Sequence, residues 1–288
     1  MKTVLFVIGT ILFFSATALQ AVVLHHQLFG VVQEPAPVFS SPDSPRILST
    51  TGKIDALADQ CGQVRTLEFI ALPGTACIVH EILESDGVTV YRITTDDYPV
   101  LPSKKLFLDA RSVKRLDVES PRRNAVLPQQ LDILRRLESA VGLPYVWGGN
   151  VREGVPAVRG KVFQGLDCSG LLYEATKGFT PRNTSELVLF GKPVKIAGLT
   201  PVKVAERLKP LDLIVWNGHV IILLDGQRAI ESRLECRKPG YGGVVIRPLK
   251  VVLTELFKSR LPVDEWPKDH VVGRKSFVVR RWFEGDGK

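Results

Sequence analysis

The sequence predicts an α+β fold in two parts: a small β-barrel, followed by a region in which a helix packs on an antiparallel sheet. Up to residue 118, short β-branched segments alternate with turn signals. Beyond residue 127, helical periodicity alternates with apolar, strand-like runs. At 288 residues, with 45% hydrophobic and 24% charged residues, the chain is long enough for two domains of ordinary globular composition.

The first 21 residues have the features of a secretory signal peptide. Lys2 supplies the positive charge, Val4 to Phe14 the apolar core, and Ala16-Thr17-Ala18 a cleavage site between small residues. The uncharged run from Val4 to Leu24 is also long enough to span a bilayer, so an uncleaved anchor is the alternative. Both alternatives predict an exported protein, in the periplasm or cell envelope, and only the anchor alternative attaches it to a membrane, through this segment alone.

Residues 28–118 are predicted to form the small barrel. The prolines of residues 25 to 45 suit a linker that enters an edge strand. The next segments are bounded by turn signals such as Pro73-Gly74 and Ser85-Asp86-Gly87. Strands are expected at Glu68–Ile78 with a break, Cys77–Leu83, Val88–Ile93, Lys105–Leu108 and Ser112–Leu116. Residues 119 to 126 are the expected boundary.

Residues 127–288 are predicted to form the second domain. A helix is expected from Leu127 to Val141, because Leu131, Leu134, Leu137 and Val141 recur at helical spacing. A second helix continues from Gly170 to Lys177, and residues 202–208 form a short helical turn. Strands are expected at Leu211–Leu224, Ala229–Leu234, Val244–Arg247 and Ser276–Arg280.

The formal net charge of +8 favours an anionic partner or surface. Nucleic acid is not expected, because the basic residues are scattered and no Lys/Arg run has interleaved aromatics. A basic, solvated surface is the simpler explanation, and an anionic cell wall would suit it. No spacing of the H-x-x-x-H or C-x-x-C kind predicts a metal site, and no cofactor is expected. We expect a monomer.

Four cysteines in an exported chain permit one or two disulfides. Cys61 and Cys77 lie in the same half, where they form either a bond with each other or two buried free thiols. Cys236 is expected to be a small core residue.

Cys168 has the surroundings of an activated thiol. It stands in Gly165-Leu166-Asp167-Cys168-Ser169-Gly170, at the opening of an apolar helical run. The amides of a first helical turn favour thiolate over thiol, and a distant histidine can act as base. Among five histidines, His219 is the candidate because it follows Trp216-Asn217-Gly218 inside an apolar strand. The alternatives are a buried structural thiol and a satisfied core histidine.

Three blocks in this order resemble the NlpC/p60 family of papain-like cysteine peptidases, over roughly residues 127 to 250. They are Gly142-Leu143-Pro144-Tyr145-Val146-Trp147-Gly148-Gly149, the Cys168 block and Asn217-Gly218-His219-Val220. The resemblance implies a papain-like catalytic domain and an SH3-like barrel before it. It implies hydrolysis of the γ-D-glutamyl–meso-diaminopimelate bond in peptidoglycan stem peptides. A papain-like amidase or transpeptidase on other wall amides, and a non-enzymatic wall-binding protein, are the alternatives.

The third catalytic residue is expected at Glu231. The family places it about twelve positions after the histidine, most often as another histidine. A three-residue turn, Asp225-Gly226-Gln227, would pair Ile221 with Glu231 and put Glu231 on the face of His219. A two-residue turn would shift the register and bring Ser232 to that face instead.

The resemblance also implies contacts to substrate. Tyr145 would point its hydroxyl toward the oxyanion, with the amide of Cys168 as a second donor. Asp167, helped by Tyr98 from the barrel, would hold a free N-terminal L-alanine amine, although a helix N-cap explains Asp167 equally well. Ser169 and Ser185 match positions that line the cleft. Residues 150–166 form a longer loop than most family members have.

Overall fold

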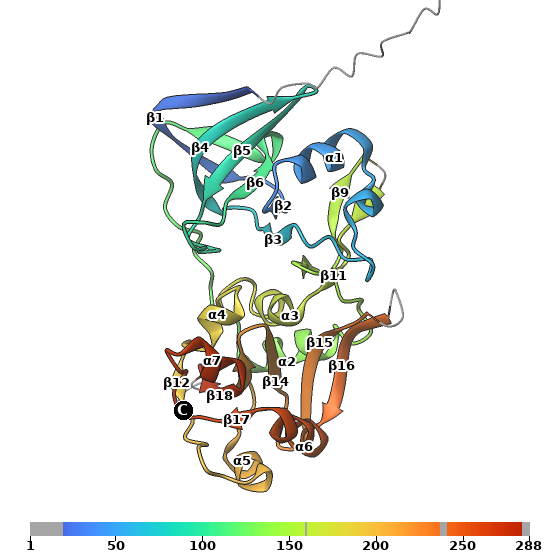
Figure 1. The fold of residues 1–288 in the computed structure, drawn as a ribbon, viewed down its shortest axis with the longest axis vertical. Coiled ribbons are helices and arrows are strands. Elements are labelled where there is room, and N and C mark those ends of the chain that lie inside the picture. The colour runs from blue at the N-terminus through green and yellow to red at the C-terminus, as the bar shows by residue number, and fades with distance from the viewer. Residues whose placement is uncertain (1–19, 159, 237–240, 284–288) are drawn as a thin grey trace, which may run out of the picture.

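The structure is a computed structural model that describes residues 20–158, 160–236 and 241–283. Two antiparallel sheets lie toward opposite ends of the long axis, and the helix α3 (Cys168–Ala175) lies between them (Figure 1). The expected α+β class with a helix on an antiparallel sheet is therefore present.

The N-terminal sheet has seven strands in the order β3-β2-β6-β5-β4-β1-β7. Four of them, β4 to β7, follow the strands expected from turn signals. The edge strands β3 and β7 have no recorded pairing with each other within the described residues, so the sheet is open and the expected closed barrel is not shown. The strands are β1 (Gln20–Val32), β2 (Ala36–Phe39), β3 (Leu67–Ala71), β4 (Ala76–Ser85), β5 (Val88–Thr94), β6 (Leu106–Asp109) and β7 (Val113–Leu116).

The interpretation of residues 25 to 45 as a linker is wrong. They contribute β1 and β2 to the sheet, and the helix α1 (Asp43–Thr51) begins before they end. Pro37 is tolerated within β2 because β2 pairs with β6 only at Phe39, which leaves Pro37 with a paired strand on the β3 side alone. Two short 3₁₀ turns, η1 (Ile54–Leu57) and η2 (Ala110–Ser112), complete this half.

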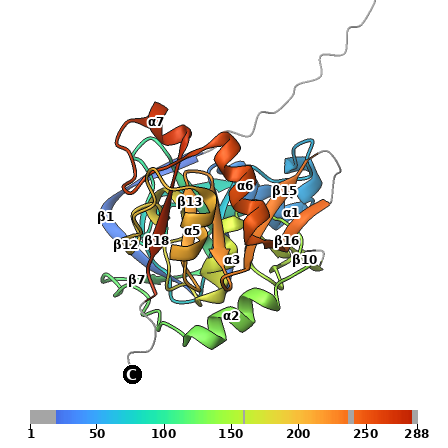
Figure 2. The same cartoon turned by 90° about the horizontal axis from the view of Figure 1, so that it is seen from below.

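The C-terminal sheet has the order β12-β18-β13-β14-β15-β16, with β17 pairing in parallel with β18. The helix α3 packs on one face through Leu171, Leu172 and Ala175. The helices α5 (Pro201–Arg207) and α6 (Leu249–Ser259) cover the other face, at the end away from the N-terminal sheet (Figures 1 and 2). The strands are β12 (Lys192–Pro193), β13 (Leu213–Trp216), β14 (His219–Leu223), β15 (Arg228–Glu235), β16 (Tyr241–Pro248), β17 (Leu261–Pro262) and β18 (Ser276–Arg281).

The apolar run from Leu211 to Leu224 is a hairpin and not the single strand expected. Strands β13 and β14 pair in it, and Asn217-Gly218 forms the turn between them. Gly218 has a φ of +103°, a region that side chains other than glycine rarely occupy. Asn-Gly is a strong hairpin signal, so this turn could have been found from the sequence.

The helix expected from Leu127 to Val141 is shorter, α2 (Gln130–Glu138), and its buried face differs. Ile133 and Leu137 are fully buried, whereas Leu131 is 64% exposed. Leu137 belongs to both the predicted and the observed stripe, but Ile133 and Ala140 take the buried positions expected for Leu131 and Val141. The remaining helices are α4 (Thr184–Leu187) and α7 (His270–Arg274).

Residues 150–166 join the two halves. They form β8 (Asn150–Val151), β9 (Val155–Ala157), β10 (Gly160–Val162) and β11 (Gly165–Leu166), in which β9 pairs with β10 and β8 with β11. Val155, Val162 and Phe163 pack against Phe39 and other core residues of the N-terminal half. The long loop expected from the sequence is thus part of an apolar core shared by both halves.

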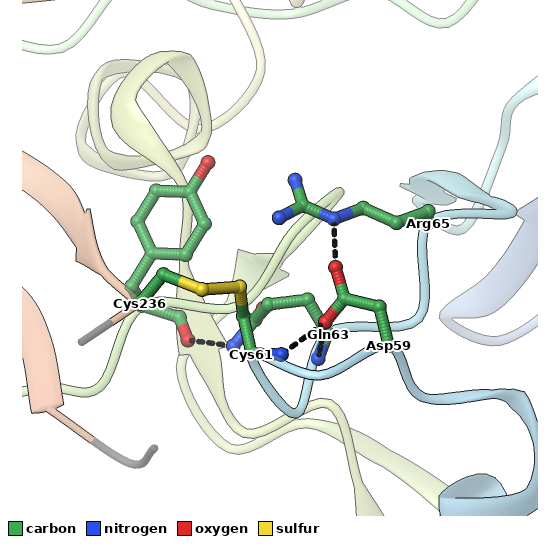
Figure 3. Close-up of a disulfide and its surroundings, with 6 residues drawn as sticks. Asp59, Cys61, Gln63, Arg65 and Cys236 are labelled. Atoms are coloured by element: carbon green, nitrogen blue, oxygen red, sulfur yellow. Dashed lines mark hydrogen bonds and ion pairs between the residues drawn. A yellow bond between two sulfur atoms is a disulfide. The ribbon is translucent and has the colours of Figure 1, made fainter. Parts of the chain in front are cut away.

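The cysteine pairing differs from both expected alternatives. Cys61 forms a disulfide with Cys236, 175 positions further along the chain (Figure 3). Cys77 is a buried free thiol, and Cys236 is exposed. The predicted Cys61–Cys77 bond and the core role of Cys236 are therefore wrong.

The predicted signal peptide and the alternative anchor fall mainly on residues 1–19, which lie outside the described residues. Among the helices that the structure describes, none combines the length and apolar character needed to cross a bilayer.

Candidate active site

Cys168 is the first residue of α3. Asp167 caps this helix, because its Oδ1 accepts a hydrogen bond of 2.6 Å from the amide of Gly170. Gly170 is required here, since a Cβ on it would lie 1.9 Å from the carbonyl oxygen of Gly149. The thiol therefore lies at the N-terminal turn of α3. Its Sγ lies 3.9 Å from the carbonyl oxygen of Gly218, next to His219.

His219 and Glu231 are paired, with 2.6 Å between Nε2 and Oε2. Leu223 of β14 pairs with Ala229 of β15. Continued along the two strands, this register places Ile221 opposite Glu231. The register expected from a three-residue turn is confirmed. The alternative register is wrong, because Ile222 pairs with Ile230, and the hydroxyl of Ser232 donates instead to the carbonyl oxygen of Leu166 at 2.6 Å.

The charges around His219 favour the imidazolium. Burial lowers the pKa of His219, but hydrogen bonds and charge interactions with Cys168 and Glu231 outweigh this effect and raise the pKa to about 9. Burial alone would raise the pKa of Glu231, but the contacts with His219 and Arg247 outweigh it and bring the pKa below its ordinary value. The site therefore holds a protonated imidazole beside an ionised carboxylate, an arrangement suited to stabilising a thiolate.

Tyr145 lies close to the thiol. Burial raises the pKa of its phenol, and the charges of Asp167 and Cys168 raise it further. Its hydroxyl therefore keeps its proton at neutral pH and is available as a hydrogen-bond donor.

Asp167 is fully engaged inside the protein. Its carboxylate accepts the amide of Gly148 at 3.1 Å and forms a bidentate ion pair with Arg182, at 2.6 and 3.0 Å. The hydroxyl of Ser169 lies within this cluster, 2.8 Å from a guanidinium nitrogen of Arg182. Ser169 and Asp167 are both buried.

Tyr98 comes from the N-terminal half and reaches the same cluster. Its ring stacks on Phe69 at 4.5 Å, and its hydroxyl donates to Glu68 at 3.0 Å. Burial is the main cause that raises the pKa of Tyr98, and charges on Arg182 and Asp167 also act on it. Tyr98 is thus close enough to Asp167 and Arg182 for their charges to act on its hydroxyl.

Ser185 is exposed on the short helix α4. The preceding hydroxyl, of Thr184, accepts a hydrogen bond of 2.9 Å from the amide of Gly218. This hydrogen bond holds α4 against the Asn217-Gly218 turn, directly before His219, so Ser185 lies in the neighbourhood of the site.

Three charged residues of the site were missed from the sequence: Arg182, Glu68 and Arg247. Arg247 lies 2.9 Å from Glu231 and also binds Glu255. Val245 is the direct partner of Glu231 across β15 and β16, so Arg247 occupies the diagonal position on the same face. A search for opposite charges on paired strands would have found it. Glu68 lies in β3, and Lys104 neutralises it at 2.5 Å.

The described residues contain no group of three or more His, Cys, Asp or Glu side chains that could hold a metal ion. The chemistry that the site can perform with its own groups is nucleophilic: a thiol at a helix start, a charged imidazole, an orienting carboxylate and a phenol donor.

No family model matches the chain, and no curated protein matches it. Three similar solved structures are NlpC/p60 proteins of low identity. They are NlpC1 of Trichomonas vaginalis (14% identity, 89% of this chain and 69% of that one, TM-score 0.33), NlpC2 of the same organism (14%, 89% and 73%, 0.33) and RipD of Mycobacterium tuberculosis (20%, 41% and 86%, 0.30). RipD is described as a non-catalytic domain adapted to binding peptidoglycan. Scores at this level leave the function of this chain to be argued from its own site.

Proposed function

We propose that this chain is an exported cysteine peptidase of the cell envelope that hydrolyses peptidoglycan stem peptides at the γ-D-glutamyl–meso-diaminopimelate bond. The observation that carries the proposal is the His219–Glu231 pair beside Cys168 at the start of α3. The substrate class follows from the resemblance of the Tyr145, Cys168 and His219 blocks to NlpC/p60 peptidases. The basic net charge suits an anionic wall.

The mechanism is acyl transfer. The thiolate of Cys168 attacks the γ-carbonyl carbon of D-glutamate, and the phenol of Tyr145 and the amide of Cys168 stabilise the oxyanion. The imidazolium of His219 protonates the departing amine of diaminopimelate. The neutral imidazole then takes a proton from water, which attacks the thioester and releases the acid. Glu231 orients the ring and stabilises its charged form.

The first test concerns the nucleophile. The full chain should be incubated with defined stem peptides and the products identified by mass spectrometry. Cys168→Ala and His219→Ala should fold but lose cleavage, because each step needs both groups. Cys77→Ala is the matched control: Cys77 is the other free thiol, and burial raises its pKa to about 11, so neither its loss nor alkylation near neutral pH should matter. Substantial turnover by Cys168→Ala would refute the thiol mechanism.

The same products separate the alternatives. An acid and a free amine show hydrolysis, whereas a new amide joined to an added amine shows transpeptidation. Binding of stem peptide without any cleavage by the wild type would favour a non-enzymatic wall-binding protein.

The second test concerns the substrate amine, which we propose lies near Asp167 and Tyr98. Asp167 already pairs with Arg182, so a peptide ammonium would join a satisfied cluster that also contains Glu68. Free tripeptides should be cut faster than sugar-linked stems, whose amide carries no charge there. Asp167→Asn, which can still cap α3, and Tyr98→Phe should both shrink this ratio of rates. Equal rates on both substrates, unchanged in the two variants, would show that Asp167 serves only as a helix cap and partner of Arg182.

A further inference from the structure

We propose that residues 59–65, here named the disulfide loop, form a positioning element of the active site. In this element Gln63 fixes the backbone on both sides of Val146, and the Cys61–Cys236 bond holds Gln63 in place. This inference rests on the proposed peptidase function, since it concerns how the Tyr145 donor is held during catalysis.

The disulfide loop is internally ordered. The Oδ1 atom of Asp59 accepts hydrogen bonds from the amides of Cys61 and Gln63, at 2.8 and 2.9 Å. Its other oxygen pairs with Arg65 at 2.6 Å, and this contact is the main cause of a lowered pKa for Asp59 (Figure 3). A loop closed on itself in this way moves as a unit, so a restraint at Cys61 also restrains Gln63.

Gln63 contacts the active-site segment through both ends of its amide. Its Oε1 accepts the amide N–H of Trp147 at 2.8 Å, and its Nε2 donates to the carbonyl oxygen of Tyr145 at 3.4 Å. The guanidinium of Arg65 lies 4.5 Å from the centre of the Trp147 ring. The side-chain amide of Gln63 thus supplies this backbone segment with the donor and the acceptor that a paired strand would otherwise supply.

The segment held by Gln63 is joined to the catalytic helix on its other side. The amide of Gly148 donates to Asp167, and the amide of Asp167 donates to the carbonyl oxygen of Gly149. Tyr145 therefore stands between two supports: the start of α3 and the disulfide loop. Release of the second support would let the phenol move relative to Cys168.

The disulfide connects the loop to a third part of the site. Cys236 directly follows β15, the strand that carries Glu231. Without the bond, the polar contacts that the structure describes between the loop and the Tyr145–Trp147 segment are two hydrogen bonds to its backbone and one cation–π contact to the Trp147 ring, each of them individually weak. The covalent bond makes their simultaneous loss much less frequent.

Because Cys236 is exposed, a reductant can reach the bond. A dithiol such as dithiothreitol would transfer two electrons and two protons to Cys61 and Cys236 and leave as its own cyclic disulfide. We expect kcat to fall on such reduction although Cys168 stays reduced, which is opposite to the usual effect of reductants on thiol enzymes.

A double-mutant cycle tests whether Gln63 acts through Tyr145. Gln63→Ala should lower kcat by between about 10- and 100-fold, with a smaller change in KM. Tyr145→Phe should lower kcat similarly, and the double variant should lose little more than Tyr145→Phe alone. The rate of alkylation of Cys168 should stay unchanged in Gln63→Ala, and the exposed Gln33→Ala should behave as wild type. Fully additive losses would overturn the proposal.

Hydrogen exchange gives a readout that needs no activity. Peptides covering residues 145–149 should exchange faster in Gln63→Ala, in the Cys61→Ser/Cys236→Ser double variant and in wild type treated with dithiothreitol. Cys77→Ser should leave exchange in this segment unchanged. If the wild type cleaves no peptide, the proposed peptidase function fails. The exchange rates of residues 145–149 still test whether the disulfide loop positions this segment. Unchanged exchange in Gln63→Ala and after reduction would overturn it.

Discussion

The row of charged side chains that supports His219 continues beyond Glu231. Glu231 binds His219 with one oxygen and Arg247 with the other, and Arg247 in turn binds Glu255. Arg247 is only 18% exposed at its side chain, whereas Glu255 is 57% exposed. The inner contact is therefore poorly screened by water and the outer one well screened, so their effects on the site should differ.

Arg247→Gln should lower kcat/KM several-fold, since it removes a positive charge that stabilises ionised Glu231. Glu231 is ionised above its pKa, and activity is lost as the pH falls through that value. Loss of Arg247 raises this pKa, so the acid limb of the pH–rate profile should move to higher pH. Glu255→Gln, the matched control, should change kcat/KM by less than about twofold. An acid limb that stays in place in Arg247→Gln would contradict the assigned role.

The raised pKa of His219 predicts the alkaline limit of activity. The imidazolium is the acid for the leaving amine, and it is lost as the pH rises through about 9. Hydrolysis should therefore decline above pH 9, whereas alkylation of Cys168 by iodoacetamide should not, because it needs only the thiolate. The two rates should be measured on the same preparation, with Cys168→Ala as the blank for alkylation. A hydrolysis rate that remains level to pH 10 would exclude His219 as this acid.

At the level of elements, the close contact between α3 and the Tyr145–Gly149 segment determines where the thiol lies. The carbonyl oxygen of Gly149 approaches Gly170 so closely that no side chain fits between them. The first turn of α3 can therefore reach both Asp167 and the segment that carries Tyr145.

Gly170→Ala should destabilise the protein by about 1–3 kcal/mol, although alanine is the better helix former by about 1 kcal/mol. The added Cβ would meet the carbonyl oxygen of Gly149 at 1.9 Å, so one backbone must shift. Gly226→Ala is the control, because nothing lies within 4 Å of its added Cβ, and it should stay within about 0.5 kcal/mol of wild type. Urea unfolding measures both. Equal stability of the two variants would show that α3 can move away without cost.

Local signals in the sequence predict the strands correctly where turn-forming residues mark both of their ends. Pro73-Gly74 and Ser85-Asp86-Gly87 delimit β3 to β5, and Asp225-Gly226-Gln227 led to the register that joins His219 to Glu231. The run from Leu211 to Leu224 is predicted as one strand, because its nearly continuous apolar residues outweigh the Asn217-Gly218 turn that divides it into β13 and β14. The buried face of α2 depended on where that helix meets α3, which periodicity alone does not fix.

Contacts between distant segments were beyond this kind of prediction. Arg182 is only 2% exposed, and its ion pair with Asp167 and its hydrogen bonds to Ser169 and Asn150 explain that position. Cys61 had three possible partners in the chain, and its pairing with Cys236 depends on how the two halves meet.

At the scale of the whole molecule, Asn150 connects the halves through a polar contact. Its side chain accepts from the amide of Ile70 at 2.8 Å and donates to the carbonyl oxygen of the same residue at 2.9 Å. Its Oδ1 also accepts from Arg182 at 3.2 Å. The N-terminal sheet, residues 150–166 and the active-site cluster therefore share one buried hydrogen-bond network.

Asn150→Ala should lower the free energy of unfolding by on the order of 2–4 kcal/mol, since it leaves both backbone groups of Ile70 without the Asn150 partner in a buried place. The exposed Asn124→Ala is the control and should change stability by less than about 0.5 kcal/mol. Denaturant unfolding followed by tryptophan fluorescence compares the two. Matching unfolding curves would mean that the halves do not depend on this contact.

The span of the Cys61–Cys236 bond has a consequence for biogenesis. A loop of 175 positions reduces the entropy of the unfolded chain enough for a stabilisation of about 5 kcal/mol, yet it also closes late. A chain that crosses a membrane from its N-terminus presents Cys61 and Cys77 first, then Cys168, and Cys236 last. In an oxidising compartment the earliest bonds would therefore join the wrong thiols, and one of those thiols is the proposed nucleophile. On the export route that we propose, maturation should therefore depend on a disulfide isomerase that returns Cys168 to its free state, and without that isomerase inactive Cys61–Cys77 or Cys61–Cys168 isomers should accumulate.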